Sequence, residues 1–260
     1  ADSDFNAYLS LGFYKYQTLQ SCPRRFYFEH LADLEPEWEP IEKKLNKRIL
    51  GSLVHNIFEA VITKIQPQLE AGRFNVSEAE LNRVIEQEII NQRLKIPKYY
   101  ENYYQKVLFP TVKEAVKEFL AQLKEKVGGE IEEVLAEWRP ERTPFLSHSR
   151  TDVSLSGRID LVVETAEQNY LIDYKTGGGS EEQLDFYSLL FSGEQTVIDR
   201  SIYDVMEQKF THEKVDSAVE FKEKIRDELT SLLASEKYQA AASYQCTRCD
   251  YQAVCRVVEE

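Results

Sequence analysis

Four cysteines lie towards the two ends of the 260-residue chain, and they constrain its fold more than any other feature. Cys22 is near the start, whereas Cys246, Cys249 and Cys255 form the pattern C-x2-C-x5-C near the end. A single centre that binds all four would bring the two ends of the chain together. The first residues lack the basic start and apolar core of a signal peptide, so we expect a cytoplasmic protein. In that reducing compartment, four cysteines favour metal ligation over disulfides.

The composition is that of a globular protein with an acidic surface. Hydrophobic residues make up 42% of the chain and charged residues 30%, and no apolar run approaches the ~20 residues of a membrane span. The net charge of −13 does not by itself indicate nucleic-acid binding. A local basic groove would suffice for that, and a site for a divalent metal needs acidic residues.

Hydrophobic spacing predicts helices in the first half of the chain. Residues 13–31 form helical turns around the Cys22–Pro23 step, and helices follow over 47–66, 77–94 and 99–127, the last with a kink at Pro110. Pro67 and Gly72 mark the end of the helix over 47–66. Residues 67–127 therefore constitute a helical insertion within a single domain that spans residues 1–260.

A change to strand periodicity follows after residue 128. We expect strands over 131–138, 153–161, 169–174 and 197–206, helices over 181–191 and 214–233, and a cysteine-bearing loop or short helix over 244–257. This order predicts an α/β fold with a mixed central sheet flanked by helices.

Two aspartates occur inside apolar strands. Asp160 lies in Gly-Arg-Ile-Asp, and Asp173 lies in Ile-Asp-Tyr-Lys, where Asp173 and Lys175 point to one face and Tyr174 to the other. A hairpin turn at 166–168 would place Asp160 beside Asp173. Two buried carboxylates are costly unless a cation lies between them, and such ligands suit Mg²⁺ or Mn²⁺. An Asp-x-Lys triplet alone is weak evidence, and ordinary acids near a turn are the alternative.

Three further residues carry little information singly. His55, at the border of an apolar helical stripe, is by itself better explained as a satisfied boundary residue than as a ligand. Gln183 and Tyr187 are four residues apart and share a helix face.

The ordered set resembles the PD-(D/E)XK nuclease superfamily, and specifically its RecB-like branch. The resemblance covers roughly residues 14–257 and rests on four motifs in order: Gly51-x3-His55, Gly157-x-x-Asp160, Asp173-x-Lys175 and Gln183-x3-Tyr187. It implies a restriction-endonuclease-like fold. The cysteine pattern is similar to that of the iron–sulfur nucleases of this branch, which include the AddB subunit of bacterial helicase–nucleases and a CRISPR-associated RecB-like family.

The resemblance implies a role for each residue. His55, Asp160, Asp173 and the main-chain carbonyl of Tyr174 would bind catalytic Mg²⁺ or Mn²⁺. Lys175 would position or help deprotonate the attacking water, and Gln183 and Tyr187 would steady the site or contact DNA. Glu137 is a candidate outer acid, although a surface role explains it equally well. Cys22, Cys246, Cys249 and Cys255 would hold a 4Fe-4S cluster, with structural zinc as the alternative.

Phosphate binding requires positive charge near the site. The candidates are Arg24, Arg25, Lys43, Lys44, Lys47 and Arg48. The tyrosine pairs 99–100 and 103–104 could stack on single-stranded bases, but helix packing is the better explanation.

The leading hypothesis is a metal-dependent DNA nuclease, most simply an exonuclease acting in recombination or repair. Its partners would be DNA, single-stranded or at duplex ends, and a helicase subunit or the rest of a larger chain. Two alternatives stay open: a non-catalytic iron–sulfur DNA-binding or scaffolding module, and a CRISPR spacer-processing nuclease.

Overall fold

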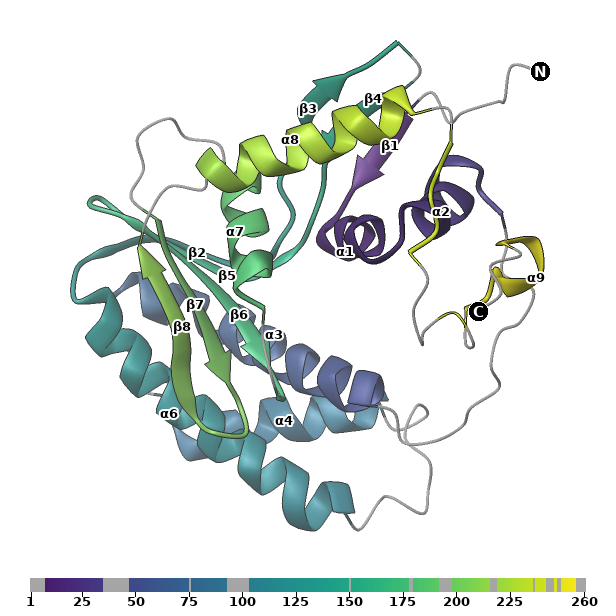
Figure 1. Ribbon diagram of the computed structural model, residues 1–260. Helices are drawn as coiled ribbons and strands as arrows, with labels where there is room; N and C mark the ends of the chain where they lie inside the picture. Colours follow the sequence, from purple (N-terminus) through teal and green to yellow (C-terminus); the bar gives the residue numbers. More distant parts are fainter. Residues whose placement is uncertain are drawn as a thin grey trace. The chain divides into compact units, whose positions relative to one another are not determined.

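The computed structural model describes most of the chain (Figure 1). The described residues are 8–34, 47–74, 76–92, 103–149, 151–177, 180–191, 198–215, 219–235, 237–241, 246 and 249–255. They form two compact units. The larger unit comprises Lys43–Arg139 and Arg158–Ser217, and the smaller comprises Ala1–Glu42, Pro140–Gly157 and Ala218–Glu260.

The larger unit is built on a five-stranded mixed sheet. The strand order is β2-β5-β6-β7-β8, in which β6 and β7 are parallel and the other neighbours are antiparallel. The parallel pair is joined through helix α7, Glu181–Leu190. The strands are β2 Ile131–Trp138, β5 Ile159–Thr165, β6 Asn169–Lys175, β7 Ile198–Asp204 and β8 Lys209–Val215.

Helices cover both faces of this sheet (Figure 1). One face packs in a continuous apolar core with α3 Lys47–Glu70, α4 Glu78–Gln92 and α6 Phe109–Val127. Alternation along β6 places Tyr170, Ile172 and Tyr174 in that core. Asp173 therefore points to the opposite face, where α7 contacts β6 and β7. Because side chains alternate along β6, one face of the strand contributes to the hydrophobic core and the other face carries the polar site.

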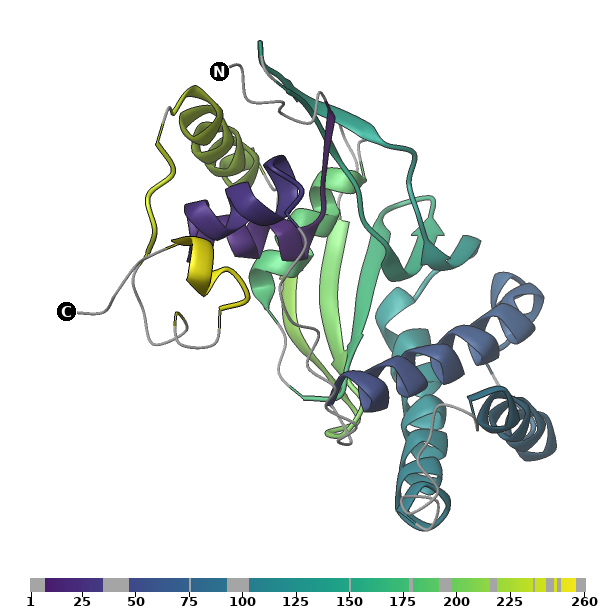
Figure 2. The ribbon, with the colours of Figure 1, turned by 90° about the vertical axis from the view of Figure 1, so that its right-hand side faces the viewer.

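The smaller unit combines three distant segments of the chain. Its sheet has the order β1-β4-β3, in which β1 Tyr8–Leu11 pairs in parallel with β4 Asp152–Leu155, and β3 Thr143–Ser147 pairs antiparallel with β4. Tyr16 of α1, Phe13–Ser21, makes an edge-on ring contact with Phe221 of α8, Val219–Ala234. The remaining helices are short: α2 Pro23–Phe26, the π-helical turn η1 Tyr27–Leu31, and α9 Gln252–Cys255 (Figure 2).

The expected mixed α/β fold is confirmed, but the strand predicted over 153–161 is wrong. That segment forms the end of β4 in one sheet and the start of β5 in another, with residues 156–158 between them. The sequence alternates through both strands, although the structure also buries polar positions such as Ser154 and Asp160, and the pattern conceals the change of sheet. Strands β1, β3 and β8 were not expected, and β8 occupies the start of the helix predicted over 214–233.

Two helix boundaries also differ from prediction. Pro67 lies inside α3, which continues to Glu70, because Leu69 is fully buried in the core and favours one more turn. Pro110 lies in the first turn of α6, directly after the π-helical turn η4, Tyr104–Leu108, so the expected kink corresponds to a change of helix type. Residues 93–102, part of two predicted helices, are outside the described residues. None of the helices described here combines the length and apolarity that a membrane crossing requires.

Candidate active site and cysteine site

The candidate active site lies where β5 and β6 stop pairing. Their antiparallel register runs from Glu164↔Asn169 to Leu161↔Ile172. One step further along, Asp160 and Asp173 would be opposite each other. There the Asp160 carboxylate accepts a hydrogen bond from the Tyr174 backbone N–H at 2.8 Å. The Asp160 side chain thus accepts a backbone hydrogen bond that a neighbouring strand would accept in a regular sheet. Both aspartates are buried.

His55 reaches this point from α3. Its Nδ1 lies 3.2 Å from Asp160 Oδ2. Burial lowers the pKa of His55, but the hydrogen bond and negative charge of Asp160 outweigh that effect, so the pKa lies above its ordinary value. The predicted pair of His55 and Asp160 is therefore in direct contact.

Asp173 is enclosed by the other candidate residues. Its Oδ1 accepts hydrogen bonds from Gln183 Nε2 at 3.1 Å and from the Tyr187 hydroxyl at 3.4 Å. Its Oδ2 lies 2.7 Å from Lys175 Nζ. The side-chain amide of Gln183 also donates to the Tyr187 hydroxyl at 2.6 Å, which links the two residues on one face of α7.

Burial sets the protonation of the Asp173 carboxyl. The residue is 1% exposed, and burial together with the negative charge of Asp160 raises the pKa to about 7, although Lys175 opposes the shift. A carboxyl in this environment is stabilised by positive charge. A bound cation would therefore stabilise the ionised form of Asp173 beyond what Lys175 supplies.

Glu137 belongs to the same group of residues. Among the residues that the structure describes, His55, Glu137 and Asp160 each offer one ligand atom, and these atoms all lie within 4.8 Å of one another. Burial and the charge of Asp160 raise the pKa of Glu137 to about 7. Asp173 is not a member of this group. Its carboxylate is held by Lys175, Gln183 and Tyr187 instead.

Sequence reasoning undervalued Glu137 and overlooked Arg158. The β2–β5 register, Ala136↔Leu161 and Trp138↔Ile159, puts Glu137 directly across from Asp160. Arg158 Nε lies 2.5 Å from Glu137 Oε2. The signal that could have identified both residues was this strand pairing, because β2 was predicted but its register was not.

The structure describes some of the basic candidates for phosphate binding. Arg24 and Arg25 lie in α2 of the smaller unit, where Arg25 pairs with Glu29 at 3.3 Å. Lys47 and Arg48 begin α3, but their side chains are outside the described set, as are Lys43, Lys44 and the tyrosine pair 99–100. Tyr103 is partly exposed, and the side chain of Tyr104 is not described.

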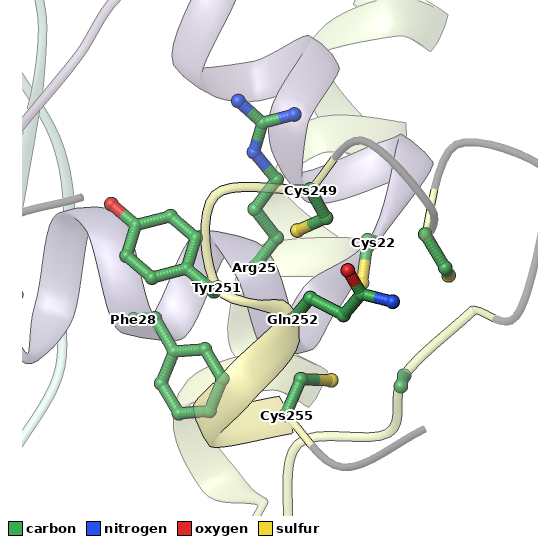
Figure 3. A pocket seen from close by; sticks show the side chains of 9 residues that line it. Cys22, Arg25, Phe28, Cys249, Tyr251, Gln252 and Cys255 are labelled. Carbon is green, nitrogen blue, oxygen red and sulfur yellow. The ribbon is translucent and has the colours of Figure 1, made fainter. Parts of the chain in front are cut away.

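The four cysteines line one cavity of the smaller unit, of about 30 Å³ (Figure 3). All four are half-buried and free of disulfides. Cys22 lies between α1 and α2, and Cys255 ends α9. Phe28 and Tyr251, whose rings are 5.8 Å apart, form an apolar wall. Four thiols around one cavity are a donor set that fits a tetrahedral metal ion or an iron–sulfur cluster.

Comparison with known proteins identifies the family. The sequence matches the family model of the PD-(D/E)XK nuclease superfamily over residues 10–256, whereas no curated protein matches. A solved structure titled "Crystal structure of SSO0001" is similar at 14% identity, with 65% of this chain and 93% of that chain covered and a TM-score of 0.30. At this TM-score the similarity adds nothing about fold or function. The family match spans nearly the whole chain, including every candidate residue above, and the chain therefore belongs to the PD-(D/E)XK nuclease superfamily.

Proposed function

We propose that this chain is an Mg²⁺- or Mn²⁺-dependent deoxyribonuclease that hydrolyses phosphodiester bonds from DNA ends. The observation that supports it most is the meeting of Asp160 and Asp173 at the split between β5 and β6, with His55 and Lys175 in contact with them. An exonuclease role in recombination or repair and a helicase partner rest on the motif order shared with the RecB-like branch.

The proposed metal ligands are His55, Asp160, Asp173 and the main-chain carbonyl of Tyr174, with Glu137 as a further acid beside them. A bound divalent ion would acidify a water molecule and stabilise charge on the scissile phosphate. The pKa of Asp173 is raised although Lys175 lies beside it, and Glu137 lies close to Asp160; both observations support a site for a divalent cation. Asp and Glu oxygens are the ligands that such hard cations prefer.

The remaining residues hold the proposed site in place. Lys175 Nζ, 2.7 Å from Asp173, is close enough to orient a water molecule or to take up its proton. Gln183 and Tyr187 fix the Asp173 carboxylate through hydrogen bonds from α7. Asp160 anchors the backbone of Tyr174, which orients the carbonyl of the same residue.

We further propose that Cys22, Cys246, Cys249 and Cys255 bind a 4Fe-4S cluster with a structural role. The four thiols line a single cavity, and they come from segments at both ends of the chain. A one-plus-three division of cysteines differs from the two close pairs typical of zinc sites, which supports iron–sulfur over zinc.

Replacing Lys175 by alanine tests the nuclease proposal. We expect Lys175→Ala to cut end-labelled DNA about 100-fold more slowly or worse, because general acid–base groups contribute roughly 10²–10⁴-fold to rate. Lys209→Ala is the matched control, since Lys209 is an exposed lysine of the same unit that pairs only weakly with Glu207. Assays with Mg²⁺, Mn²⁺ or a chelator, on linear and circular single strands, separate exonuclease from endonuclease cleavage. Equal inertness of the wild type and Lys175→Ala, with DNA binding retained, would favour the scaffolding module instead.

Two tyrosine-to-phenylalanine changes test the proposed roles of Tyr174, as a ligand through its main-chain carbonyl, and of Tyr187, as a hydrogen-bond donor to Asp173. Among the described residues, the buried Tyr174 hydroxyl has no hydrogen-bond partner, so Tyr174→Phe removes only a costly polar group. We expect its cleavage rate to be unchanged and its unfolding free energy to be equal or higher by about 1–3 kcal/mol. Tyr187→Phe removes a donor to Asp173 and should lower the rate. A strong loss of rate in Tyr174→Phe, measured beside Tyr187→Phe, would show that its side chain takes part in the reaction.

Binding of Mn²⁺ should tighten as the pH rises from 6 to 8. Burial and the charge of Asp160 raise the pKa of Asp173 and of Glu137 to about 7, so both carboxyls are partly protonated in this pH range and a cation must displace those protons. Proton release on binding therefore favours binding at higher pH. Calorimetry in two buffers of different ionisation enthalpy measures this release, which Glu137→Gln should reduce. An affinity independent of pH contradicts the assignment.

Removing Cys22 tests the cluster proposal. Anaerobically purified protein should be brown, with absorbance near ~400 nm and bound iron and sulfide. We expect Cys22→Ala to lose these features and to lower the thermal stability of the smaller unit before cleavage is affected, because the proposed catalytic residues lie in the larger unit. Ser21→Ala, at the adjacent exposed position, is the control. Stoichiometric zinc in a colourless anaerobic preparation would instead establish a zinc site.

A further inference from the structure

Arg24 is bound to the C-terminal part of the smaller unit at several points. Its backbone N–H donates to Gln239 O at 3.2 Å, and its Nε donates to Tyr238 O at 2.8 Å. One terminal nitrogen of its guanidinium donates to Cys255 O at 3.2 Å and lies 4.0 Å from Cys255 Sγ. The Arg24 side chain thus connects α2, which follows Cys22, to residues that precede Cys246 and to residues that follow Cys249 in the sequence.

The neighbouring arginine is placed differently. Arg25, unlike Arg24, lines the cysteine cavity, and its guanidinium pairs with Glu29 on its own helical segment. Figure 3 shows this guanidinium pointing away from the sulfur atoms of Cys22, Cys249 and Cys255. The two adjacent arginines therefore differ in one respect that matters here: only the contacts of Arg24 reach Cys255.

We propose that Arg24 is a positioning residue for the cysteine site, which holds Cys255 against the Cys22 helix so that the four thiols face one cavity. The inference rests on the proposed cluster. It also changes the expected role of Arg24, because a guanidinium committed to Tyr238 and Cys255 carbonyls is not a binding group for DNA phosphate. The stacked rings of Tyr27 and Tyr238, 4.2 Å apart, reinforce the same connection beside it.

The geometry requires an arginine and not merely a positive charge. The guanidinium is a planar fork with several donors, so Nε and a terminal nitrogen reach two carbonyls at once. Lysine has one nitrogen at the end of a flexible chain and cannot reproduce both contacts. Residues that orient metal ligands from outside the ligand set typically contribute about 10- to 100-fold to metal affinity.

The first experiment compares wild type, Arg24→Lys and Arg226→Lys as full chains purified without oxygen. Both variants keep the net charge, and Arg226→Lys is the matched control, because Arg226 lies in α8 of the same unit and pairs with Glu223 on its own helix. We expect Arg24→Lys to retain its iron about 10- to 100-fold more weakly when challenged with an iron chelator, as followed by absorbance and by iron and sulfide analysis. Arg226→Lys should behave as the wild type does. Equal iron retention by all three proteins overturns the proposal.

The second experiment measures amide hydrogen exchange in the metal-free proteins, where no cluster contributes. We expect faster exchange in Arg24→Lys over residues 237–255, with the amides of α8 unchanged, and no such effect over residues 237–255 in Arg226→Lys. Equal exchange in Arg24→Lys and wild type overturns the proposal, whatever happens to the iron. If wild-type protein contains no iron and sulfide, the cluster proposal fails, and the exchange result alone decides the role of Arg24.

Discussion

The hydrogen bond from the Tyr174 backbone to the Asp160 carboxylate is the contact on which the candidate site depends. It replaces a strand-to-strand bond at the point where β5 and β6 separate, and so it satisfies a buried N–H that would otherwise cost about 1–3 kcal/mol. The same bond fixes Asp160 for contact with His55 and orients the carbonyl of Tyr174. A break in the sheet thereby becomes a place where polar groups can be buried in a defined geometry.

Short-range patterns in the sequence made much of the candidate site predictable. The alternation of β6 placed Asp173 and Lys175 on one face of that strand. The four-residue spacing of Gln183 and Tyr187 placed both on one face of α7. Contact between the two pairs then required only that α7 cover β6. The two-ended cysteine pattern likewise required that both ends of the chain meet. For β6 and α7 the spacing along one element was enough, because it fixes which side chains share a face.

Features that depend on pairing between distant segments were not predictable. Residues 153–161 alternate without interruption although they serve two sheets, because periodicity records which face is buried and not which strand lies alongside. Glu137 was undervalued for the same reason: its importance comes from its register against Asp160, and strand register is a property of two segments. The contacts of Arg24 with Tyr238 and Cys255 left no trace in the local sequence.

The composition of the smaller unit has a consequence for the order of events during synthesis. Strand β1 pairs with β4, and helices α1 and α2 contact α8 and α9, which follow Ser217 in the sequence. The larger unit, in contrast, is complete in sequence once Ser217 has been made. A ribosome therefore releases Cys22 and all the residues of the candidate active site before it releases Cys246, Cys249 and Cys255, so the proposed cysteine site can form only after the larger unit is complete in sequence.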